Sequence, residues 1–294
     1  MSVDKENFLT ADINSICLWN LGTTKRTTTF KIFENGPKTG SLNSAAISSA
    51  SFNQFGNSCM FLYTLSNGDI HICDLRERSN FSRKSSQLMR TSAHMQIGPN
   101  SIYSNYLSYC SGAEFLPDQT QVVSRDYMSI KVWDLRADKP YFSANVNDYM
   151  ERNLSQLSRE DALDDEFFMA LSPDGKYLST GGYNRTAHII DANATTNTSI
   201  TCNHIQNSGQ PVGFLKAYNK QKRLIGSSLQ SDSCGESNQK SKATNSTVDS
   251  SKQVTFGAWS PFYSTVSSVQ TLALAYRNCI FLYESGNRKP TLKL

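Results

Sequence analysis

Short runs of alternating apolar and polar residues recur along the chain, and polar turns separate them. In residues 124–135, the β-branched residues Ile130 and Val132 alternate with polar side chains. β-branched side chains suit the pleated surface of a sheet, and Asp126 stands where a tight turn uses a short polar side chain. The pattern predicts two strands that are joined near Asp126 and end in a Trp-Asp dipeptide.

Similar patterns of strand, turn and strand recur elsewhere, and they close at Asn20, Asp74, Asp134, Asp191 and Glu284. The predicted strands cover 8–10, 15–20, 27–33, 47–52, 60–65, 70–75, 109–115, 141–146, 167–171, 177–182, 186–191, 198–202, 255–259, 271–276 and 279–283, together with the strand end and the second strand within 124–135. A Trp-Asp dipeptide marks the third strand of a propeller blade. The recurrence favours an all-β, WD40-type β-propeller over an isolated β-hairpin.

We expect residues 1–294 to form one propeller domain whose repeats are separated by insertions. Residues 77–108 are polar and predict an inter-blade loop with little regular structure. Residues 147–166 predict a short helical insertion. Residues 203–251 are rich in Ser, Asn, Gln and Lys, which predicts a low-complexity, disordered insertion.

The helix in 147–166 is expected because Tyr149, Leu154 and Leu157 are spaced for one helical face. Acidic residues gather at its end, at Glu160, Asp161, Asp164, Asp165 and Glu166. A solvated loop is the favoured interpretation of these acids, and they carry no assigned role.

Composition excludes several classes of function. The net charge of +4 is weak, and no Lys/Arg run with interleaved aromatic residues points to nucleic acid. The seven cysteines form no Cys-x-x-Cys pair, which is typical of reduced thiols in a cytosolic protein. The polar N-terminus predicts no signal peptide, and no apolar run approaches the ~20 residues of a membrane span.

The sequence offers little support for catalysis. It has no Gly-rich phosphate loop, no Ser or Cys nucleophile with a spaced His and acid, and no metal-ligand spacing. The four histidines are scattered, and His71 is expected to be an exposed strand residue rather than a ligand. We expect a protein that is not an enzyme and uses no cofactor.

Several segments, in order, resemble one family: the WD-repeat regulatory B subunits (55-kilodalton class) of serine/threonine protein phosphatase 2A. The resembling segments are 9–19, 67–76, 124–135, 149–168 and 256–261. The specific part is Arg-Asp-Tyr followed by Lys-Val-Trp-Asp-Leu within 124–135. The resemblance implies the C-terminal part of a seven-bladed propeller, about four to five blades.

The resemblance also implies a function. Proteins of this family are non-catalytic, sit on the phosphatase scaffold and catalytic subunits, recruit phosphoprotein substrates and direct the catalytic subunit. The resemblance implies a cytoplasmic protein, with the nucleus as an alternative, and no nucleic-acid or membrane partner. The alternatives are a generic WD-repeat scaffold for another complex, or a non-functional fragment of such a regulatory protein.

Two residues match positions that the family uses for substrate contact, Asp126 and Lys131. A carboxylate can hold Lys or Arg beside a phosphosite, and paired opposite charges can set its register. The structural alternative is that Asp126 holds the turn while Lys131 is a solvated strand charge, and both roles are compatible.

The chain also departs from the family pattern. Ile13 follows Asp12 where the family has a second acid, and the apolar contact position falls at Asn43, beside Leu42. Substrate choice is therefore expected to differ. The N-terminal blades have no counterpart, which suggests a fragment, a truncated gene model or a shortened relative. We expect the open arc to be poorly soluble, because its end sheets lack neighbours.

Overall fold

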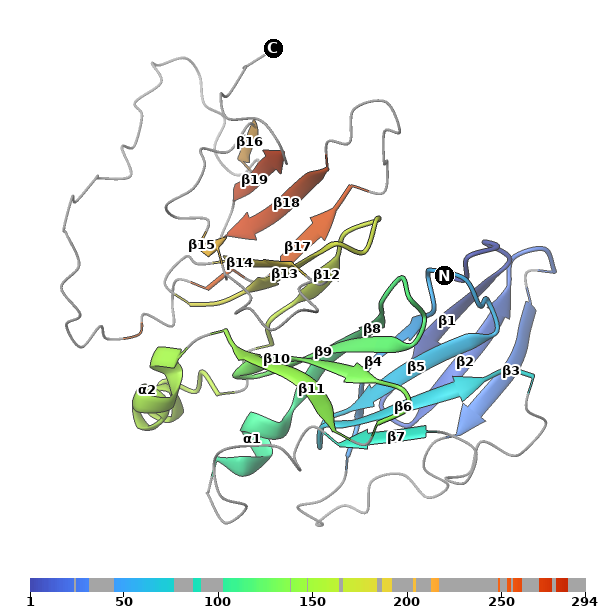
Figure 1. The fold of residues 1–294 in the computed structure, drawn as a ribbon, viewed down its shortest axis with the longest axis horizontal. Coiled ribbons are helices and arrows are strands. Elements are labelled where there is room, and N and C mark those ends of the chain that lie inside the picture. Colours follow the sequence, from blue (N-terminus) through green and yellow to red (C-terminus); the bar gives the residue numbers. More distant parts are fainter. Residues whose placement is uncertain are drawn as a thin grey trace, which may run out of the picture.

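The computed structural model describes strands, helices and part of the turns that join them (Figure 1). The described residues are 1–23, 25–31, 45–76, 87–90, 103–137, 139–146, 148–163, 166–183, 187–191, 203–204, 213–216, 248, 253–254, 256–260, 270–276 and 279–284. Their strands form five antiparallel sheets, one with three strands and four with four.

The first three sheets follow the chain order. The first has the order β1 (Asn7–Ala11), β2 (Ser15–Asn20) and β3 (Lys25–Lys31). The second has the order β4 (Ile47–Phe52), β5 (Met60–Leu65), β6 (Asp69–Asp74) and β7 (Gln87–Arg90). The third has the order β8 (Cys110–Phe115), β9 (Gln121–Asp126), β10 (Ser129–Asp134) and β11 (Pro140–Asn145).

The last two sheets differ in where their outer strand comes from. The fourth has the order β12 (Met169–Leu171), β13 (Tyr177–Gly181), β14 (Ala187–Asp191) and β15 (Asn203–His204). The fifth has the order β17 (Phe256–Trp259), β18 (Thr271–Tyr276), β19 (Cys279–Glu284) and β16 (Gly213–Lys216). The outer strand of the fifth sheet thus precedes the other three in the sequence.

Each sheet packs its apolar face on the next sheet, so the core is divided into layers. Ile16 and Leu18 of the first sheet, for example, pack against Phe52 and Phe61 of the second. Similar clusters join the second sheet to the third, the third to the fourth and the fourth to the fifth. Sheets covered on both faces explain why β5 and β10 are apolar or buried along most of their length.

The sheets are arranged as blades around an arc, with β1, β4, β8, β12 and β17 as successive inner strands. The first and last sheets lie at opposite ends of the arc (Figure 1). The prediction of a partial β-propeller is confirmed.

Two insertions contain more regular structure than their composition suggests. Within 77–108, β7 forms the outer strand of the second blade, and helix α1 (Ser104–Ser108) precedes the third. The expectation was an inter-blade loop with little regular structure, and it did not include β7, because β7 gains its hydrogen bonds from β6, which a local pattern does not reveal. Within 203–251, β15 and β16 complete the last two blades.

Other expectations fall partly on residues outside the described part of the chain. These are Leu42, Asn43, Asp164, Asp165, the strand 198–202 and most of 203–251. Helix α2 (Asp148–Arg159) lies in the range 147–166. Its residues Leu154 and Leu157 are buried, and so is Met150. Among the described residues, no helix is both long and apolar enough to cross a membrane.

Candidate functional site

The turn between β9 and β10 is held by the side chain of Asp126. One carboxylate oxygen, Oδ1, accepts the backbone N–H of Met128 at 3.0 Å and that of Ser129 at 2.6 Å. The hydroxyl of Ser129 donates to Oδ1 at 3.0 Å and to Oδ2 at 2.8 Å. Asp126 therefore holds the turn closed, because its carboxylate accepts hydrogen bonds from the backbone N–H groups two and three residues later.

Lys131 lies on β10 and forms an ion pair with Oδ2 of Asp126. The side chains are 4% and 2% exposed, so the pair is almost fully buried. The structure thus brings the two predicted site residues together. It contradicts the alternative that Lys131 is a solvated strand charge, because the side chain is buried. A buried ammonium group needs a paired carboxylate, which Asp126 supplies.

Arg125 is a further buried charge, and the sequence pattern assigned it no role. Its Nε donates to the hydroxyl of Thr180 on β13 at 3.1 Å, and its guanidinium carbon lies 5.4 Å from the centre of the Phe167 ring. Nη1 also donates to the backbone oxygens of Asp126 and Ser129. Arg125 therefore joins the turn to the fourth blade. Its place next to Asp126 in the motif is the signal from which it could have been identified.

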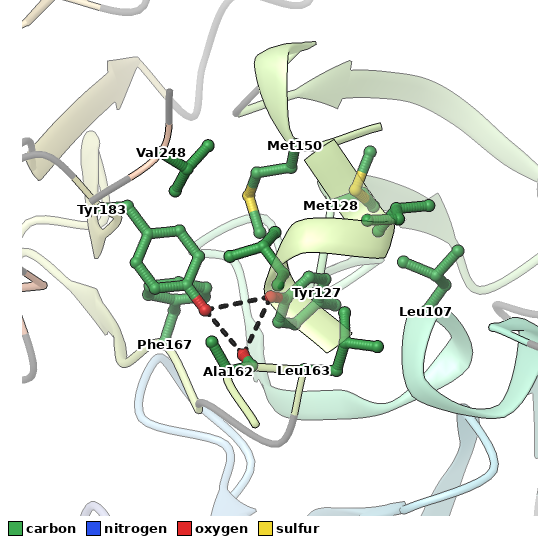
Figure 2. Packing of buried hydrophobic residues seen from close by; sticks show 11 residues of the cluster. Leu107, Tyr127, Met128, Met150, Ala162, Leu163, Phe167, Tyr183 and Val248 are labelled. Carbon is green, nitrogen blue, oxygen red and sulfur yellow. Dashed lines mark hydrogen bonds between the residues drawn. The ribbon is translucent and has the colours of Figure 1, made fainter. Parts of the chain in front are cut away.

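A buried apolar cluster supports the turn from the side of helix α2 (Figure 2). Its members are Leu107, Tyr127, Met128, Met150, Leu154, Leu157, Ala162, Leu163, Phe167, Tyr183 and Val248. The hydroxyls of Tyr127 and Tyr183 lie 3.0 Å apart, and both donate to the backbone oxygen of Ala162, at 3.0 and 2.7 Å. The turn, helix α2 and the fourth blade thus share one core.

Exposed acids lie around the end of helix α2. Glu160 accepts a hydrogen bond from Gln156 Nε2 at 2.8 Å, and Asp161 is exposed. Glu166, also exposed, accepts the hydroxyl of Tyr109 at 2.5 Å. Burial and this hydrogen bond to Glu166 raise the pKa of Tyr109. Glu166 therefore has a specific partner, whereas Asp161 is available to solvent.

The described residues hold no group of three or more His, Cys, Asp or Glu that could bind a metal ion. His71 stacks on Tyr63, with ring centres 4.7 Å apart, in a cross-strand pair. Burial, and then the nearby Asp126 carboxylate, raise the pKa of the Cys110 thiol to about 12. Such a thiol is a poor nucleophile, because the thiolate is the reactive form.

The chain was compared with protein families and with curated proteins. No protein-family model matches the chain. The beta isoform of the serine/threonine-protein phosphatase 2A 55 kDa regulatory B subunit of Carassius auratus is 27% identical over 283 residues, covering 96% of this chain and 58% of that protein. The corresponding beta isoform of Arabidopsis thaliana is 25% identical over 284 residues, covering 96% of this chain and 54% of that protein.

Among solved structures, the crystal structure of Chaetomium thermophilum Raptor has a TM-score of 0.54 and 14% identity. The match covers 96% of this chain and 19% of Raptor, and at this identity it bears on the fold alone. The chain is thus similar along nearly its whole length to 55 kDa regulatory B subunits of protein phosphatase 2A, and it spans about half the length of those relatives.

Proposed function

We propose that this chain is a non-catalytic regulatory subunit of protein phosphatase 2A that recruits phosphoprotein substrates and directs the catalytic subunit. The observation that carries the proposal is the similarity to two regulatory B subunits over 96% of the chain. The segments 124–135 and 149–168, which hold Asp126, Lys131 and most of helix α2, also resemble that family. A generic propeller need not carry both.

The partners in this proposal are the scaffold subunit and the catalytic subunit of the phosphatase, in the cytoplasm. A propeller can serve this role because rigid blades hold many loops in fixed positions. Binding then places a substrate beside an active site on another chain, and the propeller itself performs no chemistry.

The burial of Asp126 and Lys131 suggests how they would contribute to substrate contact. Since their side chains are 2% and 4% exposed, we propose that they act mainly by holding the β9–β10 turn, on which helix α2 packs. The exposed acid Asp161 would then face basic residues beside a phosphosite.

The test is capture of the tagged native protein from its source cells, followed by mass spectrometry and a phosphatase assay on the captured material. The expected result is recovery of the scaffold and catalytic subunits with activity that okadaic-acid-type inhibitors block. A Lys131→Met variant, which leaves Asp126 unpaired, should recover less of both. A Tyr106→Phe variant, at a side chain that is 42% exposed, is the matched control. Recovery of other proteins in place of the phosphatase subunits would favour the scaffold alternative.

A further inference from the structure

Strand β1, the innermost strand of the first sheet, corresponds to the second strand of each other sheet. Its residue Asn7 pairs with Asn20, where the first sequence pattern closes. The residues that pair with the other closing residues lie on β5, β9, β13 and β18, the second strands of their sheets. Among the described residues, the first sheet therefore has no counterpart of the inner strands β4, β8, β12 and β17.

The register shows where an inner strand of the first sheet would lie. The backbone N–H of Ser2 donates to the backbone oxygen of Asn7, the first residue of β1, at 2.8 Å. In the other sheets, the residue directly after the inner strand makes the same bond to the first residue of the second strand: Asn53 to Met60, Leu116 to Gln121, Ser172 to Tyr177 and Ser260 to Thr271. Ser2 therefore marks the end of this place, and Met1 stands where the second sheet has Phe52.

The inner edge of β1 has unpaired backbone groups. Successive residues of an antiparallel strand point their N–H and C=O groups to opposite sides. The N–H of Asp12 bonds to Ser15 on the side of β2, so the groups of Leu9 and Ala11 point to the inner edge. In the described part of the chain, no hydrogen bond joins the groups of Leu9 and Ala11 on that edge to another residue. Such an edge can pair with a further strand.

Side chains beside this edge are less covered than their counterparts in other blades. Leu9 is half-buried, whereas its counterparts Leu62 and Val123 are 0% and 1% exposed. Ala50 of β4, which packs toward the first sheet, is also half-buried. Its counterpart Ala113 is 1% exposed, because β4 of the preceding blade lies against β8. The first blade is therefore open at the place where the other blades hold an inner strand.

We propose that the inner edge of β1 binds an extended peptide segment of a partner protein, which adds to the sheet as an antiparallel fourth strand. The inner strands of the other sheets indicate which side chains fit, because they hold the same place. They carry small residues at or near their centres: Ser49, Ala50 and Ser51 in β4, Gly112 and Ala113 in β8, and Gly257 and Ala258 in β17. A second copy that paired through its own β1 would bring the larger Phe8 and Leu9 to this place, so a segment of small residues fits better.

A serine in the partner segment would have a specific acceptor. On β4, Ser51 pairs with Leu62, and its hydroxyl donates to the backbone oxygen of Ala113 in the next blade at 3.0 Å. By the same register, a serine opposite Leu9 would donate to the backbone oxygen of Ala50. The partner segment is therefore extended and carries Ser or another small residue opposite Leu9. This inference goes beyond the proposed function and does not rest on it.

The test adds a synthetic peptide of residues 46–51, with both ends blocked, to the full chain and follows hydrogen exchange by mass spectrometry. At saturation, the fragment covering 7–13 should show two amides, those of Leu9 and Ala11, that exchange about tenfold more slowly. The fragment covering β3, at the other edge of the sheet, should be unchanged. A peptide with Ser51→Pro lacks the N–H that would bond to Leu9, so its affinity should be roughly fivefold lower.

Two variants at one position test the edge in the protein itself. Ala11→Pro removes an N–H on the inner edge and leaves the bonds between β1 and β2, so it should weaken peptide binding roughly fivefold. Ala11→Ser keeps that N–H and is the matched control, which should bind like the parent. If Ala11→Pro loses the circular dichroism of the parent, the comparison of the two peptides still decides.

Two results would overturn the proposal. One is the absence of protection in 7–13 at peptide concentrations up to about 1 mM, which is already weak binding. The other is equal affinity for the parent peptide and the peptide with Ser51→Pro. A concentration-dependent dimer that Ala11→Pro abolishes, without peptide binding, would assign the edge to a second copy instead. None of these outcomes depends on the phosphatase, so failure of this inference and failure of the proposed function are separate.

Discussion

The ammonium group of Lys131 and the carboxylate of Asp126 form an ion pair inside the third blade, with side chains that are 4% and 2% exposed. Asp126 also accepts two backbone N–H groups and a hydroxyl, so its oxygens are fully used in closing the turn. A pair of this kind contributes more to the geometry of the turn than to net stability, because its desolvation cost offsets most of the attraction.

Removing either member of the ion pair between Lys131 and Asp126 should lower the stability of the protein. Lys131→Met and Asp126→Asn should each lower the free energy of unfolding by about 3 kcal/mol, because each leaves a buried group without its opposite charge. The double variant should cost clearly less than the two single changes together, and urea unfolding of the four proteins measures this difference. Arg136→Met provides the control, since the ion pair of Arg136 with Asp134 is at the surface and its loss should leave the midpoint unchanged. Additive costs would contradict a coupled pair.

The contributions of the Tyr127 and Tyr183 hydroxyls to the free energy of unfolding should depend on each other. Tyr183→Phe and Tyr127→Phe should each lower the free energy of unfolding by about 1 kcal/mol, since each removes a hydrogen bond to Ala162. The double variant should cost less than the sum, because the hydroxyls also contact each other. Thermal or urea unfolding gives the values, and Tyr106→Phe should have no effect. Equal costs at all three positions would contradict the network.

Glu114 on β8 should make stability depend on pH. Burial raises its pKa from 4.5 to about 7. Between these two values the folded state holds a proton that the unfolded state has lost, so the free energy of unfolding should fall as pH rises from about 4.5 to 7. Glu114→Gln should remove up to about 3 kcal/mol of this dependence and should be more stable than the parent above pH 7. Parallel pH profiles for the two proteins would contradict the assignment.

The outer face of the fifth sheet should cause the isolated chain to associate. Phe256 is 63% exposed and Ile280 is 40% exposed, and register places Ala275 between them. An apolar sheet face of this kind is normally covered in a propeller. Phe256→Arg should shift light-scattering masses toward the monomer, whereas Tyr106→Arg should not. A parent chain that is monomeric by light scattering would contradict this prediction.

Local pattern predicted much of the blade framework. The strands β2, β4, β5 and β18 begin and end at the predicted residues, because each is an apolar or β-rich run between turn residues. The positions of Asp126 in a turn and of Leu154 and Leu157 on the buried side of a helix also followed from local spacing.

Contacts between residues far apart in the sequence could not be predicted from the local pattern. Strand β16 pairs with β19, and Val248 bonds to Gln156, across separations that no local period encodes. The burial of Arg125 and Lys131 was equally hidden, since charged side chains are usually exposed unless a partner is known. The buried residues of the site could therefore be identified only in the folded structure, where neighbouring blades pack together.

The central claim is tested most directly by mixing the purified chain with a purified dimer of the phosphatase scaffold and catalytic subunits. Sedimentation velocity should show a complex of one copy of each protein, and that complex should dephosphorylate a phosphoprotein substrate faster than the dimer alone. If the chain retains the circular dichroism of a β protein, yet sediments apart from the dimer and leaves its activity unchanged, the regulatory function proposed above is wrong.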